Sequence, residues 1–87
     1  MTQENKKKAI DRLSRIEGQV KGLKKMIDDD TYCIDVISQT SSVRSALKGL
    51  EDMLLEQHLS CCVGDQIKSG KEKKAVDEII KVYKLKR

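Results

Sequence analysis

Apolar residues recur every three or four positions along most of this 87-residue chain, and that spacing limits the fold more than any other feature. Between residues 4 and 27 they form one stripe of an amphipathic helix. The positions are Ile10, Leu13, Ile16, Val20, Leu23 and Ile27. The chain has no Pro, Phe or Trp, so it lacks both helix breakers and the aromatics typical of β-sandwiches. We therefore predict an all-α protein.

Three helices are predicted, over residues 4–27, 32–63 and 70–83, within a single domain that covers residues 1–87. Gly64 is the expected residue at which the second helix ends. Ser69 and Glu72 have the spacing of a capping box and are expected to open the third helix. Because so short a chain without large aromatics has a thin core, we expect an obligate oligomer.

Several classes of protein are disfavoured by the same sequence. No apolar run approaches the ~18 residues of a membrane span, and residues 1–8 have no apolar segment like that of a signal peptide. The three cysteines are odd in number and include no C-x-x-C, so a disulfide framework is a poor interpretation. We expect a cytoplasmic protein that does not contact a membrane.

Positive charge is concentrated at both ends of the chain. Eight Lys or Arg lie within residues 5–25 and eight within 68–87, whereas residues 26–67 hold two against eight acidic residues. This pattern suggests a surface for a polyanion such as DNA. The alternative is that Lys-rich helix faces simply keep a small protein soluble.

The second predicted helix carries two thiols and the only histidine along one line. At about 100° per residue, His58 and Cys62 each lie within about 20° of the direction of Cys33, whereas Cys61 lies about 80° away from it. The apolar residues between them should make this the buried face of the helix. His58 and Cys62 are one turn apart, so one metal ion could contact both. The alternative for each residue is an ordinary structural role, as a small thiol in the core or as a histidine near the end of a helix.

Cys33 cannot join the other two donors within one unbroken helix, because 25 residues span roughly 37 Å. A second copy of the helix that runs antiparallel removes this difficulty, because Cys33 of one copy can then face the His58–Cys62 pair of the other. In that arrangement the numbers of facing residues sum to about 93, and the twofold axis lies near Ala46 and Leu47. Small residues such as Ser45 and Gly49 would then allow close approach. A kink at Gly49 that folds the helix back on itself is the less favoured alternative.

Two thiolates and one imidazole suit a soft ion. Cu(I) favours sulfur and accepts low coordination numbers, whereas a structural Zn(II) site would need a fourth ligand that this line does not supply. Nickel and cobalt would prefer more nitrogen or oxygen donors.

The sequence resembles the copper-sensitive operon repressor family over nearly its whole length. The resemblance rests on residues 12–20 (RLSRIEGQV), 32–36 (YCIDV), 46–47 (AL) and 55–62 (LEQHLSCC). It implies an all-α, three-helix protomer, an antiparallel dimer of the second helix that forms a four-helix bundle, and a disc-shaped tetramer. It also implies a cytoplasmic repressor that senses Cu(I), nickel or cobalt, formaldehyde or persulfides.

The Cys–His–Cys arrangement is similar to the copper-sensing branch, so the resemblance implies that Cys33, His58 and Cys62 bind Cu(I). Tyr32 and Glu78 match the positions that support the histidine in that branch. Residues 1–5 contain no His, which disfavours nickel sensing. His58 argues against the persulfide-sensing branch, and Cys61 lies outside the pattern.

The resemblance also implies DNA binding without a helix-turn-helix, through a basic surface spread over the assembly. Arg12 and Arg15 are the best matches to family positions. Weaker candidates for contacts to DNA phosphates are Lys6, Lys7, Lys8 and Lys21.

The predicted function is that of a homodimeric or homotetrameric repressor that binds double-stranded operator DNA without metal and is released by Cu(I), so that copper-resistance genes are expressed. A persulfide-sensing or other thiol-reactive repressor is the alternative within the family. A cytoplasmic copper chaperone or buffer is the alternative from another class. An enzyme is disfavoured, because one His without a partner acid on its face forms no catalytic constellation.

Overall fold

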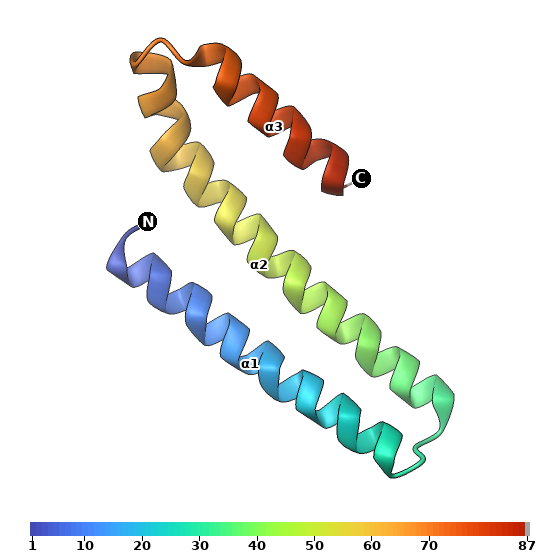
Figure 1. Ribbon diagram of the computed structural model, residues 1–87. Helices are drawn as coiled ribbons and strands as arrows, with labels where there is room; N and C mark the ends of the chain where they lie inside the picture. The colour runs from blue at the N-terminus through green and yellow to red at the C-terminus, as the bar shows by residue number, and fades with distance from the viewer. Residues whose placement is uncertain (87) are drawn as a thin grey trace. The chain divides into compact units, whose positions relative to one another are not determined.

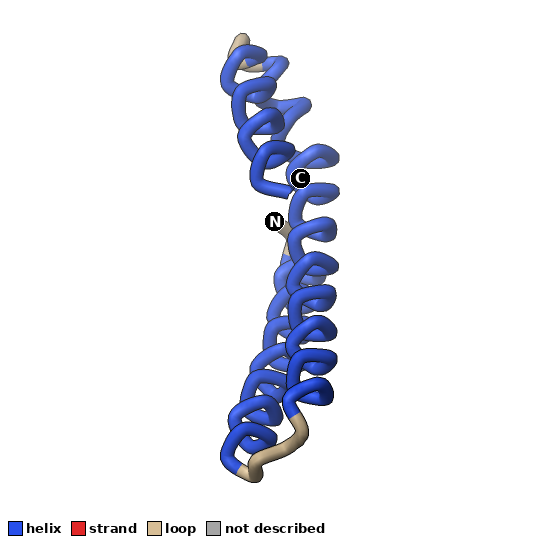
Figure 2. The backbone as a smooth tube through the Cα atoms, turned by 90° about the vertical axis from the view of Figure 1, so that its right-hand side faces the viewer, coloured by secondary structure: helices blue, strands red, loops and turns tan. Residues whose placement is uncertain are grey.

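A computed structural model of the chain describes residues 1–86 as three α-helices joined by two short connections (Figure 1). Helix α1 spans Gln3–Asp28, α2 spans Cys33–Lys68 and α3 spans Glu72–Lys86. None of the described residues lies in a strand, which confirms the all-α prediction (Figure 2). Within that part of the chain, no helix combines the length and the apolar character that crossing a membrane requires.

Local hydrogen bonds define both ends of α1. The hydroxyl oxygen of Thr2 accepts the backbone N–H of Asn5 at 3.1 Å, which caps the first turn. At the other end Asp30 has a positive φ of 56°, and the N–H of Thr31 donates to the carbonyl of Met26 at 2.9 Å. This is the hydrogen-bond pattern of a Schellman turn, with an aspartate in the position where glycine is usual.

The second helix is longer than predicted. It does not end at Gly64 but continues to Lys68. The turn that ends it contains Gly70, whose φ of 75° favours glycine, and the N–H of Lys71 donates to the carbonyl of Gln66 at 2.7 Å. The prediction was wrong because Gly64 stays helical, whereas Gly70 adopts the left-handed conformation that closes the helix.

The predicted capping box at the start of α3 does not form. The hydroxyl of Ser69 donates to the carbonyl of Asp65 at 2.8 Å, so Ser69 belongs to the turn that follows α2. Helix α3 begins at Glu72, and the carbonyl of Lys71 accepts the N–H of Ala75 at 3.0 Å. Because Lys71 occupies the capping position, the third helix starts two residues later than predicted.

The chain divides into two compact units, and the division falls within α2. Unit 1 is Met1–Leu54 and unit 2 is Leu55–Arg87. In unit 1, α1 lies alongside the first part of α2 (Figures 1 and 2). The buried side chains of this unit are Ala9, Ile16, Val43 and Leu50. So few buried residues agree with the thin core expected from the composition.

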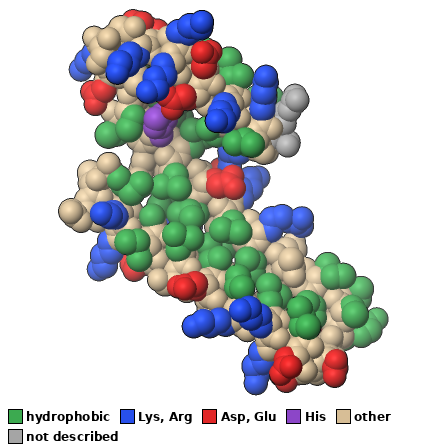
Figure 3. Space-filling model, in the orientation of Figure 1, with side chains coloured by type: hydrophobic (Ala, Val, Ile, Leu, Met, Phe, Trp, Pro, Cys, Tyr) green, Lys and Arg blue, Asp and Glu red, His purple; other side chains and the backbone are tan. Residues whose placement is uncertain are grey.

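The face of α2 that was predicted to be buried is only partly buried in unit 1. Val43 and Leu50 are buried, whereas Cys33, Ile37 and Leu47 are exposed. Val43 and Leu50 lie roughly 80–100° from Cys33 around the helix, so α1 covers a neighbouring face and leaves the thiol face open. The prediction of one buried stripe was therefore wrong for the protomer. Hydrophobic side chains consequently lie on the surface of unit 1 (Figure 3).

Gly49 does not produce a kink, because α2 is helical on both sides of it. A Cβ at this position would lie 3.3 Å from Nη1 of Arg12 on α1. The small size of Gly49 thus accommodates the Arg12 side chain within unit 1. The alternative in which the helix folds back at Gly49 is excluded.

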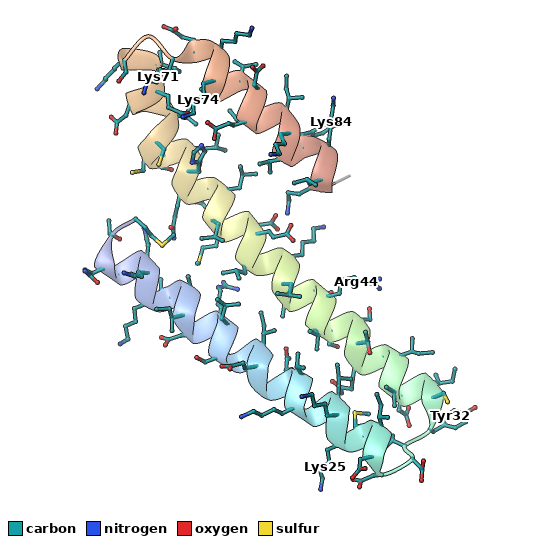
Figure 4. The ribbon with its side chains drawn as sticks, viewed as in Figure 1. Lys25, Tyr32, Arg44, Lys71, Lys74 and Lys84 are labelled. Carbon is teal, nitrogen blue, oxygen red and sulfur yellow. The ribbon has the colours of Figure 1, made fainter. Side chains whose placement is uncertain are left out.

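In unit 2, α3 packs along the last part of α2 (Figures 1 and 2). Ala75 is the most buried residue described, with 2% of its surface exposed, because its small side chain allows the two helices to approach. The exposed residues of α3 include Lys74 and Lys84, and Lys71 is exposed just before the helix begins; all three are labelled in Figure 4.

Candidate metal centre

All three predicted donors lie on α2, but in different environments. Cys33 is the first residue of the helix and is exposed. It lines an open hollow of ≈ 380 Å³ at the end of unit 1, together with Ile27, Val36 and Ile37. The thiol is therefore accessible, and the surface around it is largely apolar.

His58 and Cys62 lie one helical turn apart in unit 2, and both are half-buried. They lie on the part of α2 along which α3 packs, where Gln66 bonds to Glu78 of α3. Among the described residues the His58 imidazole has no hydrogen-bond partner, so both ring nitrogens are available to a metal ion and to a supporting acceptor.

The surroundings of Cys62 raise the pKa of its thiol. A hydrogen bond with the thiol of Cys61 raises the pKa of Cys62, and desolvation and the negative charge of Asp65 raise it further. A metal ion that binds Cys62 must therefore displace a proton. Cys61 is exposed, as Cys33 is.

The donor types fit Cu(I), which prefers thiolate and imidazole ligands at low coordination number. Within residues 1–86 no three His, Cys, Asp or Glu side chains are grouped so that they could hold a metal ion. The three predicted donors therefore do not form a group within the described residues of one chain.

The two residues predicted to support the histidine also differ in environment. Tyr32 is 71% exposed in the connection before α2, where its side chain projects outward (Figure 4). Glu78 is half-buried on α3, and its Oε1 accepts a hydrogen bond from Nε2 of Gln66 at 3.1 Å. Gln66 was missed in the sequence, although it follows Cys62 by four residues and so lies one turn beyond it on the helix.

The basic residues predicted to contact DNA all lie on α1 and are exposed: Lys6, Lys7, Lys8, Arg12, Arg15 and Lys21. Lys8 forms an exposed ion pair with Glu4 at 3.4 Å, a kind of contact that adds little stability. Arg12 differs from the other basic residues in that its guanidinium also lies against Gly49 of α2.

The chain belongs to a family of transcriptional regulators. A family model described as the metal-sensitive transcriptional repressor matches residues 5–84, which is nearly the whole chain.

Its relatives include named copper sensors. The chain is 44% identical over 79 residues to the copper-sensing transcriptional repressor CsoR of Bacillus subtilis, a match that covers 91% of this chain and 78% of that protein. It is 51% identical over 59 residues to the copper-sensing transcriptional repressor RicR of Mycobacterium tuberculosis, covering 68% of this chain and 62% of that one.

A solved structure shares the fold. The copper-sensing repressor CsoR with Cu(I) from Geobacillus thermodenitrificans aligns with a TM-score of 0.91 and 39% identity, over 98% of this chain and 88% of that one.

Proposed function

We propose that this chain is a Cu(I)-responsive transcriptional repressor that binds operator DNA in its metal-free form and leaves it when Cu(I) binds, so that copper-resistance genes are expressed. The observation that carries the proposal is the donor set of α2: an exposed Cys33 at its first residue, and half-buried His58 and Cys62 one turn apart in unit 2. The relatives named as copper sensors support the choice of metal.

The proposed site is completed by a second copy of the chain. Cys33 of one protomer would combine with His58 and Cys62 of its partner, as an antiparallel pair of α2 helices allows. The exposed apolar side chains on the Cys33 side of α2 favour this pairing. Ile37 is 63% exposed and Leu47, beside the predicted dyad, is 41% exposed, so both would gain burial in a dimer. Two dimers would then form the disc-shaped homotetramer.

The DNA-binding surface is proposed to lie on α1, where the exposed Lys and Arg residues would contact phosphates of double-stranded operator DNA. Such contacts position a protein on DNA and make its affinity fall with rising salt. On this view the chain is a cytoplasmic regulator and not an enzyme.

Coupling between the two activities would pass through α3. When bound, Cu(I) would fix the His58 ring, and the free ring N–H could then donate to Glu78 on α3, with Tyr32 beside Cys33 as a further support. Copper acts as an inducer only if it binds the DNA-incompetent form more tightly, typically by ~1–3 kcal/mol.

The decisive experiment is an anaerobic Cu(I) titration of the protein bound to its own promoter DNA. We expect the metal-free protein to retard the DNA in a mobility assay, and stoichiometric Cu(I) to release it. A copper chaperone or buffer would bind Cu(I) but leave the DNA unretarded throughout, and that outcome would reject the repressor.

A thiol-reactive signal such as a persulfide is the second candidate, and the exposure of Cys61 beside Cys62 is the observation that favours it. The same mobility assay distinguishes the two signals. Release by a persulfide donor with no release by Cu(I) would replace the copper proposal with this one.

A further inference from the structure

The side chain of Gln66 links two helices of unit 2. Its Nε2 donates to Oε1 of Glu78, which is twelve residues away on α3, and the bond is partly buried. The hydroxyls of Thr40, Ser42 and Ser69, by contrast, donate to backbone carbonyls four residues back along the chain. The Gln66–Glu78 bond therefore fixes where the Glu78 carboxylate lies relative to α2.

The orientation of the Gln66 amide leaves one of its own atoms unsatisfied. A carboxylate only accepts hydrogen bonds, so the amide nitrogen must face Glu78. The amide oxygen is then buried with no partner among the described residues. An unpaired buried acceptor is unfavourable, and an apolar side chain of the same length would avoid it. Gln57 Oε1 is unpaired in the same way, so the bond to Glu78 is the feature that distinguishes Gln66.

Gln66 lies on the same stretch of α2 as two of the proposed metal donors. His58, Cys62 and Gln66 follow each other at intervals of four residues, so each lies one turn beyond the last and about 40° further around the helix. Glu78 contacts this stretch from α3 through its bond to Gln66. Its Oε1 is already engaged by Gln66, whereas no bond to Oε2 is present among the described residues.

We propose that Gln66 is a positioning residue for the copper response: its amide holds Oε1 of Glu78 and leaves Oε2 to accept the ring N–H of His58. This inference rests on the proposed function. A carboxylate that is held in place before the metal binds loses less side-chain freedom on forming the new bond. More of the metal's binding energy is then available to move α3.

Gln66→Met tests the role, because methionine keeps the length of the side chain but cannot donate. Gln57→Met is the matched control, since Gln57 is a half-buried glutamine of the same helix in the same unit, and its Oε1 is also unpaired. The measured quantity is the ratio of operator Kd with and without saturating Cu(I). We expect Gln66→Met to lower this ratio about fivefold, in line with the net contribution of one typical hydrogen bond, and Gln57→Met to leave it unchanged.

A double variant separates positioning from general packing. In a Glu78→Ala background, Gln66→Met should lower the ratio no further, because the residue acts through Glu78. A second measurement does not depend on the folding of the Gln66 variant. In metal-free protein, the side-chain amide proton resonances of Gln66 should shift on Glu78→Ala.

The outcomes are distinguishable. Absence of copper-driven release in the wild-type protein rejects the proposed function and the inference with it. Normal wild-type release combined with an unchanged ratio for Gln66→Met rejects only the role of Gln66. Equal losses in the Gln66 and Gln57 variants, or an unshifted Gln66 amide in Glu78→Ala, would also overturn it.

Discussion

Mixed protomers test whether the copper site is shared between two chains. One preparation carries Cys33→Ala and the other His58→Ala, so each homodimer lacks one donor at both of its sites. In a mixed dimer the intact Cys33 of one chain faces the intact His58 and Cys62 of its partner, which restores one site. The second site of that dimer lacks both mutated donors.

The size of the recovery follows from the twofold symmetry. Free exchange of equal amounts makes about half of the dimers mixed, and each mixed dimer regains one of its two sites. The mixture should therefore bind about a quarter as much Cu(I) as the wild-type protein. The assay is anaerobic Cu(I) titration against a competing chelator, before and after incubation of the two variants together.

A second mixture supplies the control. Variants His58→Ala and Cys62→Ala lose donors from the same end of α2, so no mixed dimer of these two contains a complete site. The Cu(I) binding of this mixture should not recover after incubation. If Cys33→Ala and His58→Ala also fail to complement, and differently tagged chains are shown to exchange, the three donors do not meet across a dimer and the reasoning is refuted.

Three further predictions follow from the environments of single side chains. Cys61→Ser should preserve Cu(I) stoichiometry and release from DNA, whereas Cys62→Ser should abolish release; equal damage to copper binding in a titration would show that the helix is irregular there. Glu78→Ala should change Cu(I) affinity by less than tenfold, about 1.4 kcal/mol, yet weaken copper-driven release in the mobility assay, and a larger loss of affinity with normal release would contradict its supporting role. Leu50→Ala should lower the free energy of unfolding by about 2–4 kcal/mol in urea titrations, because Leu50 is only 8% exposed within the protomer. Leu47→Ala should instead weaken dimerisation in sedimentation experiments. If both leucine variants lowered the free energy of unfolding equally and left dimerisation unchanged, the proposed interface would be contradicted.

Helix identity could be predicted from local sequence, and helix ends only in part. Both ends of α1 fall within one residue of the prediction, since the periodic stripe stops where the acidic run begins. Gly64 was predicted to end α2, but the helix continues through it to Lys68. Gly70 has the positive φ that closes the helix, and composition does not state which glycine adopts that conformation.

The chemistry of the candidate site was largely determined by the sequence. Two thiols and an imidazole on one line of a helix indicate a soft ion whatever the surrounding fold, because donor type and a period of 3.6 residues are local properties. The incompleteness of the donor set within one chain followed from the same spacing. Its completion by a second chain stays a prediction.

The tertiary structure alone decided which faces of α2 are covered and by what. Periodicity marks an apolar side of a helix but does not state where its neighbour packs, so Val43 and Leu50 are buried against α1 while Ile37 and Leu47 remain exposed. The Gln66–Glu78 bond was likewise decided by the tertiary structure. It joins residues of two helices whose relative rotation no local pattern specifies, and it exists only because α3 folds back along α2.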